Sequence, residues 1–279
     1  MTGTLFLVGT PIGNLGDLSP RALETLQESD FIAAEDTRVT LKLLNHFGLK
    51  KPLVSYYEHN RTASGERILE RLQAGETCAL VTDAGMPAIS DPGEDLVRLC
   101  RDAGVPVRVV PGPSSVVSAL ALSGLPAGRF TFEGFLSVAK KSRSDHLKQL
   151  KGETRTMIFL EAPHKLKATL ADLLSVLGDR EITLSRELTK IHEETLHMTL
   201  SQACVYYEQT PPRGEFVLCV RGAEPDAAPE TNLEDAVASV LVRLEAGASL
   251  KDAARQVSEE TGLSRKVLYD AALRERKEG

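Results

Sequence analysis

Several kinds of sequence signal are missing from this chain, and each absence excludes a class of protein. No run of about 18 apolar residues occurs, so we expect no membrane-spanning helix. An apolar run starts at Leu5 with no basic segment before it, so we expect no signal peptide. The four cysteines are scattered without any CxxC spacing. They predict buried thiols in a reducing, cytoplasmic compartment, and neither a disulfide framework nor a zinc site.

Phosphate-binding and metal-binding signatures are also absent. Neither GxGxxG nor GxxxxGK[ST] occurs, which excludes the dinucleotide fingerprint and the P-loop. The six histidines do not cluster, and His192 and His197 would lie on opposite faces of a strand, so we expect no metal. The net charge of -6 requires that any nucleic acid bind at a local basic patch. One basic run is present, and it is either a solvated helix face or a phosphate-binding surface: Lys140, Lys141, Arg143, Lys148, Lys151 and Arg155.

The first half of the chain alternates short apolar runs with helical patterns, which is typical of βα units and a parallel sheet. The predicted strands are Thr4–Val8, Phe31–Ala34, Leu53–Ser55, Thr77–Thr82 and Val107–Val110. Predicted helices are Pro20–Glu28, capped by Ser19, and Arg61–Gln73 and Pro92–Ala103, each followed by a glycine. After Arg129 the strands suggest a more antiparallel set, covered by a helix at Pro163–Leu177: Thr131–Phe135, Thr156–Leu160, Glu181–Ser185, Glu194–Leu200 and Glu215–Val220.

These patterns divide the chain into four parts. Residues 1–123 form an α/β domain with a parallel sheet, and residues 124–222 form a second α/β domain with a mixed sheet. Residues 223–230 are rich in Pro, Ala and acidic side chains and are typical of a linker. Residues 231–279 are helical throughout, with a turn at Gly262. This last part is compatible with a helix-turn-helix and equally with a small packing bundle.

The stretch Val81–Gly93 stands out because it is longer and stiffer than a connection needs to be. It follows an apolar strand, precedes a helical pattern and contains two prolines and two glycines. Ordinary βα connections have about 2–6 residues. In open α/β sheets, ligands bind at the carboxyl edge, where Asp83 would stand. We therefore interpret this loop as part of a binding site.

Polar groups also follow three further strands, and each has a purely structural explanation as well as a functional one. The loop Gly9–Gly16 is rigid but lacks phosphate-cradling spacing, and it is also readable as a tight turn. Asp36 and Arg38 follow the second strand; Asp36 is a natural helix cap and Arg38 a possible anion contact. The stretch Pro111–Ser115 brings hydroxyls and N–H groups to a helix start, which suits a carboxylate or a simple N-cap.

The second half adds charged groups at the ends of two apolar strands. Glu161 ends one strand, and Arg186, Glu187 and Lys190 follow another. Such a group of charges at a strand end indicates a functional site more often than a chance arrangement on the surface. A structural ion-pair network is the alternative.

Eight stretches occur in a fixed order along nearly the whole chain: VGTPIGNLGDLSPRAL, AAEDTR, VTDAGMPAISDPG, VPGPSS, EGF, IFLEAPH, RELTKIHEE and GEFV. Together they resemble the tetrapyrrole-methylase superfamily, the class III S-adenosylmethionine-dependent methyltransferases. More closely, they are similar to its bacterial branch that methylates the ribose 2′-oxygen of a cytidine in 16S ribosomal RNA. The resemblance implies two α/β domains with S-adenosylmethionine in the cleft between them, a helical C-terminal appendage and a homodimer acting on the small ribosomal subunit.

The resemblance also implies which residues bind the methyl donor. Matched by motif, the cofactor pocket would contain Ile12, Asp83, Met86, Ser115, Val116 and Glu161. The family commonly has a tyrosine and a serine where this chain has Leu160 and Ala162, so a tyrosine hydroxyl would be missing here.

Methyl transfer to a ribose hydroxyl requires alignment and help with a weakly acidic proton. We expect Glu187, Arg186 and Lys190 to supply this help, with Asp36 and Arg38 facing them from the first domain. Glu187 would be the proton acceptor or an orienting group, and the cations would contact RNA phosphates. Two alternatives stay open: a methyltransferase of the same fold acting on a tetrapyrrole or another small molecule, and a non-catalytic nucleic-acid-binding regulator.

Overall fold

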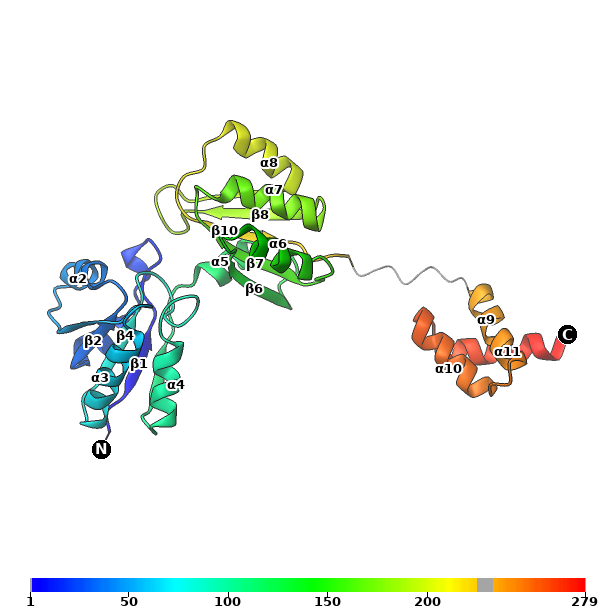
Figure 1. Cartoon of the computed structure of the whole chain (residues 1–279), viewed down its shortest axis with the longest axis horizontal. Helices are drawn as coiled ribbons and strands as arrows, with labels where there is room; N and C mark the ends of the chain where they lie inside the picture. Colours follow the sequence, from blue (N-terminus) through cyan, green and yellow to red (C-terminus); the bar gives the residue numbers. More distant parts are fainter. Residues whose placement is uncertain (1, 225–232, 279) are drawn as a thin grey trace. The chain divides into compact units, whose positions relative to one another are not determined.

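The computed structural model describes residues 2–224 and 233–278, which form two compact units (Figure 1). The first unit comprises residues 1–222 and the second residues 223–279, and each is described here by itself. Residues 225–230 of the predicted linker lie outside the described residues. No helix within the described ranges combines the length and the apolar character needed to cross a bilayer.

The first sheet contains five parallel strands in the order β3-β2-β4-β1-β5. The strands are β1 (Leu5–Val8), β2 (Phe31–Ala34), β3 (Leu53–Ser55), β4 (Cys78–Val81) and β5 (Val107–Val110). The connecting helices are η1 (Leu15–Asp17), α1 (Pro20–Glu28), α2 (Thr37–His46), α3 (Arg61–Gln73), α4 (Glu94–Asp102) and α5 (Ser115–Ser123). Three strands and two helices have the predicted bounds; the helix predicted from Pro92 begins two residues later, after Gly93.

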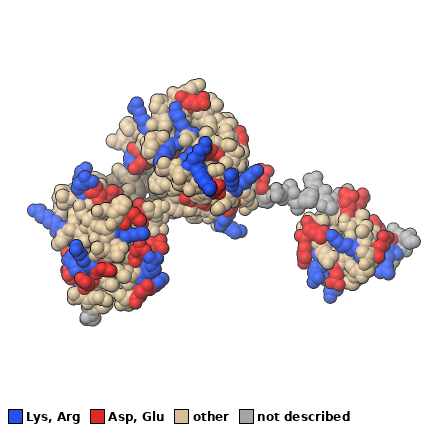
Figure 2. Space-filling model, viewed as in Figure 1, with Lys and Arg blue, Asp and Glu red and all other residues tan. Residues whose placement is uncertain are grey.

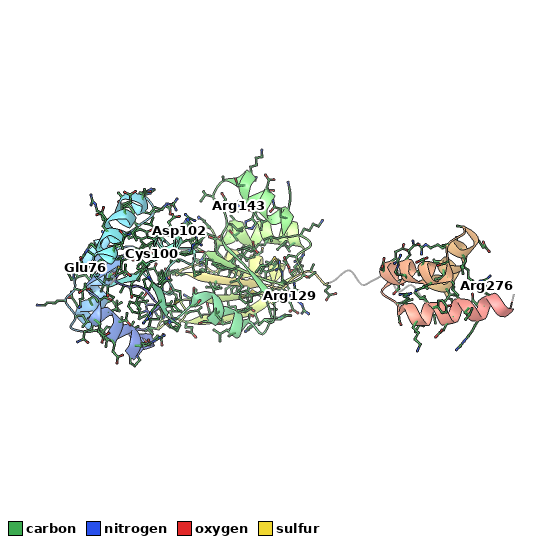
Figure 3. All side chains as sticks on the ribbon, turned by 90° about the horizontal axis from the view of Figure 1, so that it is seen from below. Glu76, Cys100, Asp102, Arg129, Arg143 and Arg276 are labelled. Carbon is green, nitrogen blue, oxygen red and sulfur yellow. The ribbon has the colours of Figure 1, made fainter. Side chains whose placement is uncertain are left out.

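Both faces of this sheet are covered, which explains the continuous apolar strands. Every residue of β2 and of β4 is buried, as parallel sheets with helices on both sides require. Phe31 and Leu80 pack into the core on one face, and Ile32 and Ala79 into the core on the other. Cys78 and Cys100 lie in the first of these cores (Cys100 is labelled in Figure 3), and burial raises the pKa of the Cys78 thiol to about 12.

The second sheet has the strand order β6-β7-β10-β8-β9, in which β6 and β7 are parallel and the other pairs antiparallel. Its strands are β6 (Phe130–Phe135), β7 (Thr156–Glu161), β8 (Glu181–Arg186), β9 (Glu194–Thr199) and β10 (Phe216–Val220). Its helices are α6 (Lys140–Gln149), α7 (Leu166–Leu177) and α8 (Leu200–Gln209). The strand predicted to reach Leu200 ends at Thr199, because Thr199 and Gln202 form a capping box that starts α8.

Helix α5 joins the two sheets within the first unit. It follows β5, but its Ala119 and Leu120 pack with Ile158 and Val217 of the second sheet. The Thr183 hydroxyl of β8 donates to the Ser123 carbonyl at the end of α5, at 3.3 Å. The carboxyl edge of the first sheet is thereby held against the second sheet.

The second unit contains α9 (Leu233–Glu245), α10 (Leu250–Thr261) and α11 (Arg265–Glu278) around a core of its own. Ser249 caps α10 by accepting from the Asp252 N–H. Gly262 ends α10 in the left-handed conformation, and α11 begins three residues later. The predicted order of helix, glycine turn and helix is confirmed.

Candidate functional site

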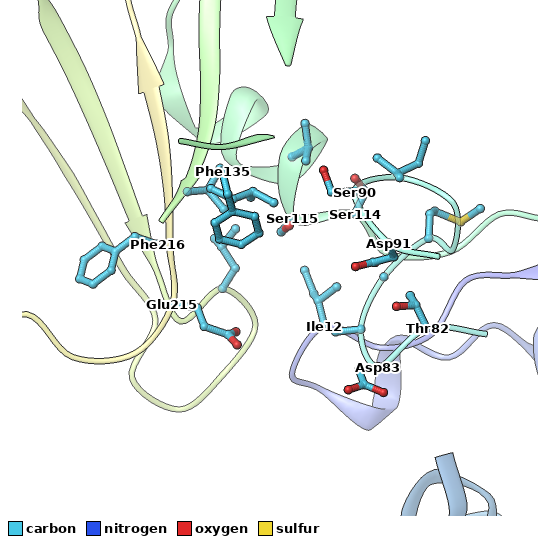
Figure 4. Close-up of a pocket in the computed structure, with 18 of the residues that line it drawn as sticks. Ile12, Thr82, Asp83, Ser90, Asp91, Ser114, Ser115, Phe135, Glu215 and Phe216 are labelled. Atoms are coloured by element: carbon cyan, nitrogen blue, oxygen red, sulfur yellow. The ribbon is translucent and has the colours of Figure 1, made fainter. Parts of the chain in front are cut away.

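A cavity of about 520 Å³ lies where the carboxyl edge of the first sheet meets the second sheet (Figure 4). The loops after β1, β4 and β5 form one wall, and the ends of β7, β8 and β10 form the other. Figure 4 shows Ile12 projecting into the middle, with Ser90, Ser114 and Ser115 on one side of it and Asp83 on the other. The volume lies within the roughly 300–1,000 Å³ usual for small-molecule sites.

The loop Val81–Gly93 is fixed to the loop after β1. Thr10 and Gly85 exchange two backbone hydrogen bonds of 2.9 and 3.1 Å, and the Thr10 hydroxyl donates to the Thr82 carbonyl at 3.2 Å. The loops after β1 and β5 touch through backbone: a Cβ on Gly112 would lie 2.8 Å from the Gly9 Cα. Only glycine permits this approach, so the cavity wall is built from closely packed main chain.

Backbone strain is concentrated around the cavity. Among the described residues, four that are not glycine have positive φ: Ala88 (67°), Ser90 (61°), Glu187 (51°) and Thr189 (65°). The first two lie in the loop after β4 and the other two in the loop after β8. Strained conformations of this kind cluster at ligand sites.

All six residues predicted to bind the cofactor line the cavity: Ile12, Asp83, Met86, Ser115, Val116 and Glu161. Their roles remain predictions, but the fold brings them together from the loops after β1 and β4, from α5 and from β7. Leu160 and Ala162, where the family commonly has tyrosine and serine, line it as well. Glu161 is buried, accepting from the Thr169 hydroxyl at 2.5 Å and the Ala162 N–H at 2.8 Å, so each of its carboxylate oxygens already has a partner within the chain.

The cavity wall at the carboxyl edge of the first sheet carries three carboxyl groups around Thr82, two of which were not predicted as site residues. The Thr82 hydroxyl donates to Glu35 at 2.6 Å, and Asp83 and Asp91 line the same wall. Burial and the neighbouring Glu35 raise the pKa of Asp83. Burial raises the pKa of Asp91 to about 6, with Glu35 and Asp83 adding to the effect and a bond from Thr82 opposing it. This wall therefore favours a positively charged ligand group.

Opposite this wall, the middle of the second sheet presents an apolar patch with one hydroxyl, and the charged residues Glu161, Lys190 and Glu215 line the same cavity. Leu160, Val217 and Ser185 stand side by side across β7, β10 and β8, on the face turned to the cavity. The Ser185 side chain is buried, at 1% exposure, and its oxygen has no hydrogen-bond partner among the described residues.

A second cavity of about 400 Å³ adjoins the first, with α2 forming part of its wall. The two cavities share six lining residues: Ile12, Thr82, Asp83, Ala84, Lys190 and Glu215. The shared wall is thus the place where a ligand in one cavity would meet a ligand in the other.

Lys190 is the cation of this shared wall. Its ammonium group donates to Glu187 and to Glu215, each at 2.9 Å, and the Glu215 N–H donates to Glu187 at 3.0 Å. Burial alone would lower the pKa of Lys190, but the two carboxylates outweigh it and the pKa is raised. Burial raises the pKa of Glu187, but the bonds from Lys190 and the Glu215 N–H reverse this and the pKa is lowered. Both groups are therefore charged at neutral pH.

Of the five predicted catalytic residues, Lys190 lines both cavities, whereas Glu187, Arg186, Asp36 and Arg38 line neither. Arg186 donates to Glu194 on β9 at 3.0 Å. Asp36 caps α2 and binds Arg38, whose pKa is raised by the pair, while the pKa of Asp36 falls to about 2. The Asp36 N–H donates to Asp83 at 3.1 Å, so Asp36 supports a cavity carboxylate through its backbone.

The basic run around α6 is partly neutralised. Arg143 binds Asp172 at 2.6 Å, Arg155 binds Glu153 at 2.6 Å and Lys148 lies 3.8 Å from Asp145. Arg143 is labelled in Figure 3, and Figure 2 shows lysine and arginine side chains over the part of the first unit that contains the second sheet. No group of three or more His, Cys, Asp and Glu side chains within residues 2–224 and 233–278 is arranged to hold a metal ion.

Comparison with known proteins places this geometry in a family. Residues 4–204 match the family described as Tetrapyrrole (Corrin/Porphyrin) Methylases, and residues 231–277 match the RsmI C-terminal HTH domain. Ribosomal RNA small subunit methyltransferase I of Synechocystis sp. is 49% identical over 97% of this chain and 98% of its own length. The protein of the same name from Thermotoga maritima is 48% identical over 80% of this chain and 100% of its own length.

Among solved structures, uroporphyrin-III C-methyltransferase from Thermus thermophilus, complexed with S-adenyl homocysteine, has the same fold. Its TM-score is 0.55 at 20% identity, over 78% of this chain and 97% of its own. The predicted fold class is confirmed. The chain belongs to the tetrapyrrole methylase family and, within it, to the family of ribosomal RNA small subunit methyltransferase I.

Proposed function

We propose that this protein transfers a methyl group from S-adenosylmethionine to the ribose 2′-oxygen of a cytidine in 16S ribosomal RNA, within the small ribosomal subunit. The observation that carries the proposal is the identity of 49% to ribosomal RNA small subunit methyltransferase I over 97% of the chain. The two adjoining cavities with a shared wall support it, because methyl transfer needs a donor and an acceptor in contact.

The donor fits the first cavity by its chemistry. When bound, S-adenosylmethionine supplies an activated methyl group on a positively charged sulfur. It also carries an ammonium group and a carboxylate but no phosphate, which agrees with the absence of a phosphate fingerprint. Asp83 and Asp91 offer negative charge to its cationic groups, and the N-terminus of α5 at Ser115 offers N–H groups to its carboxylate.

Donor binding is expected to depend on pH through Asp91. Its pKa of about 6 means that it loses its negative charge as the pH falls from 7 to 5. A cationic donor favours the ionised form, so affinity should fall on acidification through pH 6. Calorimetric titration with S-adenosylmethionine between pH 5 and 7.5 measures this. Asp91→Asn should bind more weakly at pH 7 and lose most of the dependence in that window. An unchanged pH profile in Asp91→Asn would contradict the assignment.

On the acceptor side, we propose that Lys190 lowers the energy of negative charge on the attacking oxygen. Lys190 lines both cavities, and Glu187 and Glu215 hold its ammonium group in position. With its pKa lowered by these bonds, Glu187 is a weak base, which supports its expected role as an orienting group over that of proton acceptor.

A direct assay separates this proposal from its alternatives. The protein would be incubated with labelled S-adenosylmethionine and, separately, small ribosomal subunits, naked 16S RNA and tetrapyrroles. Label on the cytidine ribose of the RNA is the expected result. Label on a tetrapyrrole alone would favour the small-molecule acceptor. Donor binding without any transfer, joined with RNA binding, would favour a non-catalytic regulator.

We also propose a homodimer, working in the cytoplasm, on the strength of family membership. Light scattering of the purified protein tests the dimer: the chain mass is 30.3 kDa, so a particle of twice that mass is expected. A particle of the chain mass at micromolar concentration would contradict the dimer.

The helical second unit is expected to be dispensable for donor binding. All residues that line the first cavity lie between Ile12 and Val217, and the second unit has its own core. A protein ending at Gly222 should bind S-adenosylhomocysteine within about twofold of the full chain. A loss of more than tenfold, with the first unit still folded by circular dichroism, would contradict the prediction.

A further inference from the structure

The Ser185 hydroxyl is an exception to the rule that buried polar groups are hydrogen-bonded. It lies on β8 at 1% exposure, with no partner among the described residues, and it lines the first cavity. Leaving such a group unpaired costs stability. Thr183, two residues earlier on the same face, shows the ordinary case: its hydroxyl donates to the Ser123 carbonyl at 3.3 Å and lies 3.1 Å from His197 Nδ1.

The surroundings of Ser185 indicate which part of a ligand it would meet. Towards the cavity it pairs with Val217 on β10, and Leu160 on β7 lies beyond, both apolar and both in the cavity wall; its partner on the other side, Thr195 on β9, does not line the cavity. The carboxyl groups of Asp83 and Asp91 and the start of α5 belong to the opposite wall. An adenine ring has apolar faces and polar edge atoms, so it matches the apolar patch of Leu160 and Val217 with the single hydroxyl of Ser185 beside it. The charged amino-acid end of the donor matches the opposite wall.

We propose that the Ser185 hydroxyl hydrogen-bonds the adenosyl part of the methyl donor and is a positioning residue of the binding site. The inference rests on the proposed function, since it takes S-adenosylmethionine as the ligand. It makes Ser185 a residue whose hydroxyl is unsatisfied in the free protein and satisfied in the complex. Removing the hydroxyl should therefore affect the two states in opposite directions.

The test measures binding and stability of Ser185→Ala in the full-length protein. Calorimetric affinity for S-adenosylhomocysteine should fall roughly five- to tenfold, as expected for one lost neutral hydrogen bond. The melting temperature of the ligand-free variant should equal or exceed that of the wild type. Thr183→Val is the matched control: it removes a satisfied hydroxyl outside the cavity, so it should melt about 2–4 °C lower and keep wild-type affinity.

A fragment of the donor locates the contact. Methylthioadenosine contains the adenosyl part without the amino-acid end, so Ser185→Ala should weaken its binding by the same factor as for S-adenosylhomocysteine. An unchanged affinity for methylthioadenosine would overturn the assignment to the adenosyl part. Wild-type affinity for both ligands, or a lowered melting temperature without a loss of affinity, would overturn the binding role. Failure of the wild type to bind S-adenosylhomocysteine would instead overturn the proposed donor, and the inference with it.

Discussion

Replacing Lys190 by methionine is expected to slow methylation of the small subunit by about 10²–10³-fold at saturating donor, the usual effect of losing one preorganised electrostatic group. Lys190 is the cation on the wall shared by the two cavities, and two carboxylates hold it there. Its pKa is raised, so it is charged when the acceptor oxygen begins to lose its proton. Affinity for S-adenosylhomocysteine should change by less than about threefold, because the positive charge acts in the transition state.

Three further variants sharpen this expectation. Lys167→Met removes an exposed lysine of α7 that lines neither cavity, so it should methylate at the wild-type rate. Glu187→Gln keeps the shape of the side chain but weakens its bond to Lys190. If Glu187 serves to orient Lys190, the methylation rate should fall about tenfold. A loss of about 10²–10⁴-fold would instead identify Glu187 as the base. Wild-type rates in both Lys190→Met and Glu187→Gln would contradict the assignment of this group. Arg186→Ala, which breaks the bond to Glu194, tests the remaining predicted cation.

Gly112→Ala is expected to damage both folding and donor binding. The added Cβ would lie 2.8 Å from the Cα and the carbonyl oxygen of Gly9, and neither backbone atom has room to give way. We expect a loss of about 1–3 kcal/mol in the free energy of unfolding, as for overpacked cores. Affinity for S-adenosylhomocysteine should fall by more than about tenfold, because the separated loops carry Ile12 and Ser115 and small displacements are costly.

Gly128→Ala is the matched control for this variant. No heavy atom lies within 4 Å of the position that its Cβ would take. Chemical denaturation should therefore give a change below about 0.5 kcal/mol, and donor affinity should stay at the wild-type value. Equal behaviour of the two variants would mean that the loops after β1 and β5 do not need to touch.

The sequence predicted the first sheet well because its strands are short, apolar and separated by clear helix signals. The bounds of Phe31–Ala34, Leu53–Ser55 and Val107–Val110 agree with the structure. The meeting of the loops after β1, β4 and β5 also follows from the sequence, because the carboxyl ends of parallel strands share one edge. Helix α8 was not predicted, and the predicted strand ran one residue into it, since the alternating pattern of β9 continues without a break to Leu200.

The parts of the site that the sequence did not reveal depend on contacts between distant residues. Asp91 belongs to a conspicuous Pro/Gly loop, but its raised pKa comes from burial beside Glu35 and Asp83. Ser185 directly precedes the charged residues Arg186 and Glu187, which the sequence marks as site candidates. That its hydroxyl lacks a partner depends on the tertiary structure. Arg186, in contrast, looked like a site residue in the sequence, whereas its guanidinium binds Glu194 on the next strand.

The four non-glycine residues with positive φ around the cavity imply that thermal stability and methylation rate cannot both be at their highest. Each such conformation costs a residue with a side chain about 1–2 kcal/mol, and Ala88 and Ser90 lie beside the loop carboxylates. Glycine at either position would relieve the strain, so selection for survival at high temperature should enrich Ala88→Gly and Ser90→Gly. The same substitutions would free the loop to leave the conformation that the ligand requires. Variants selected in this way should have a higher free energy of unfolding and a lower methylation rate. Such a trade-off between stability and activity is common in enzymes with a strained active site.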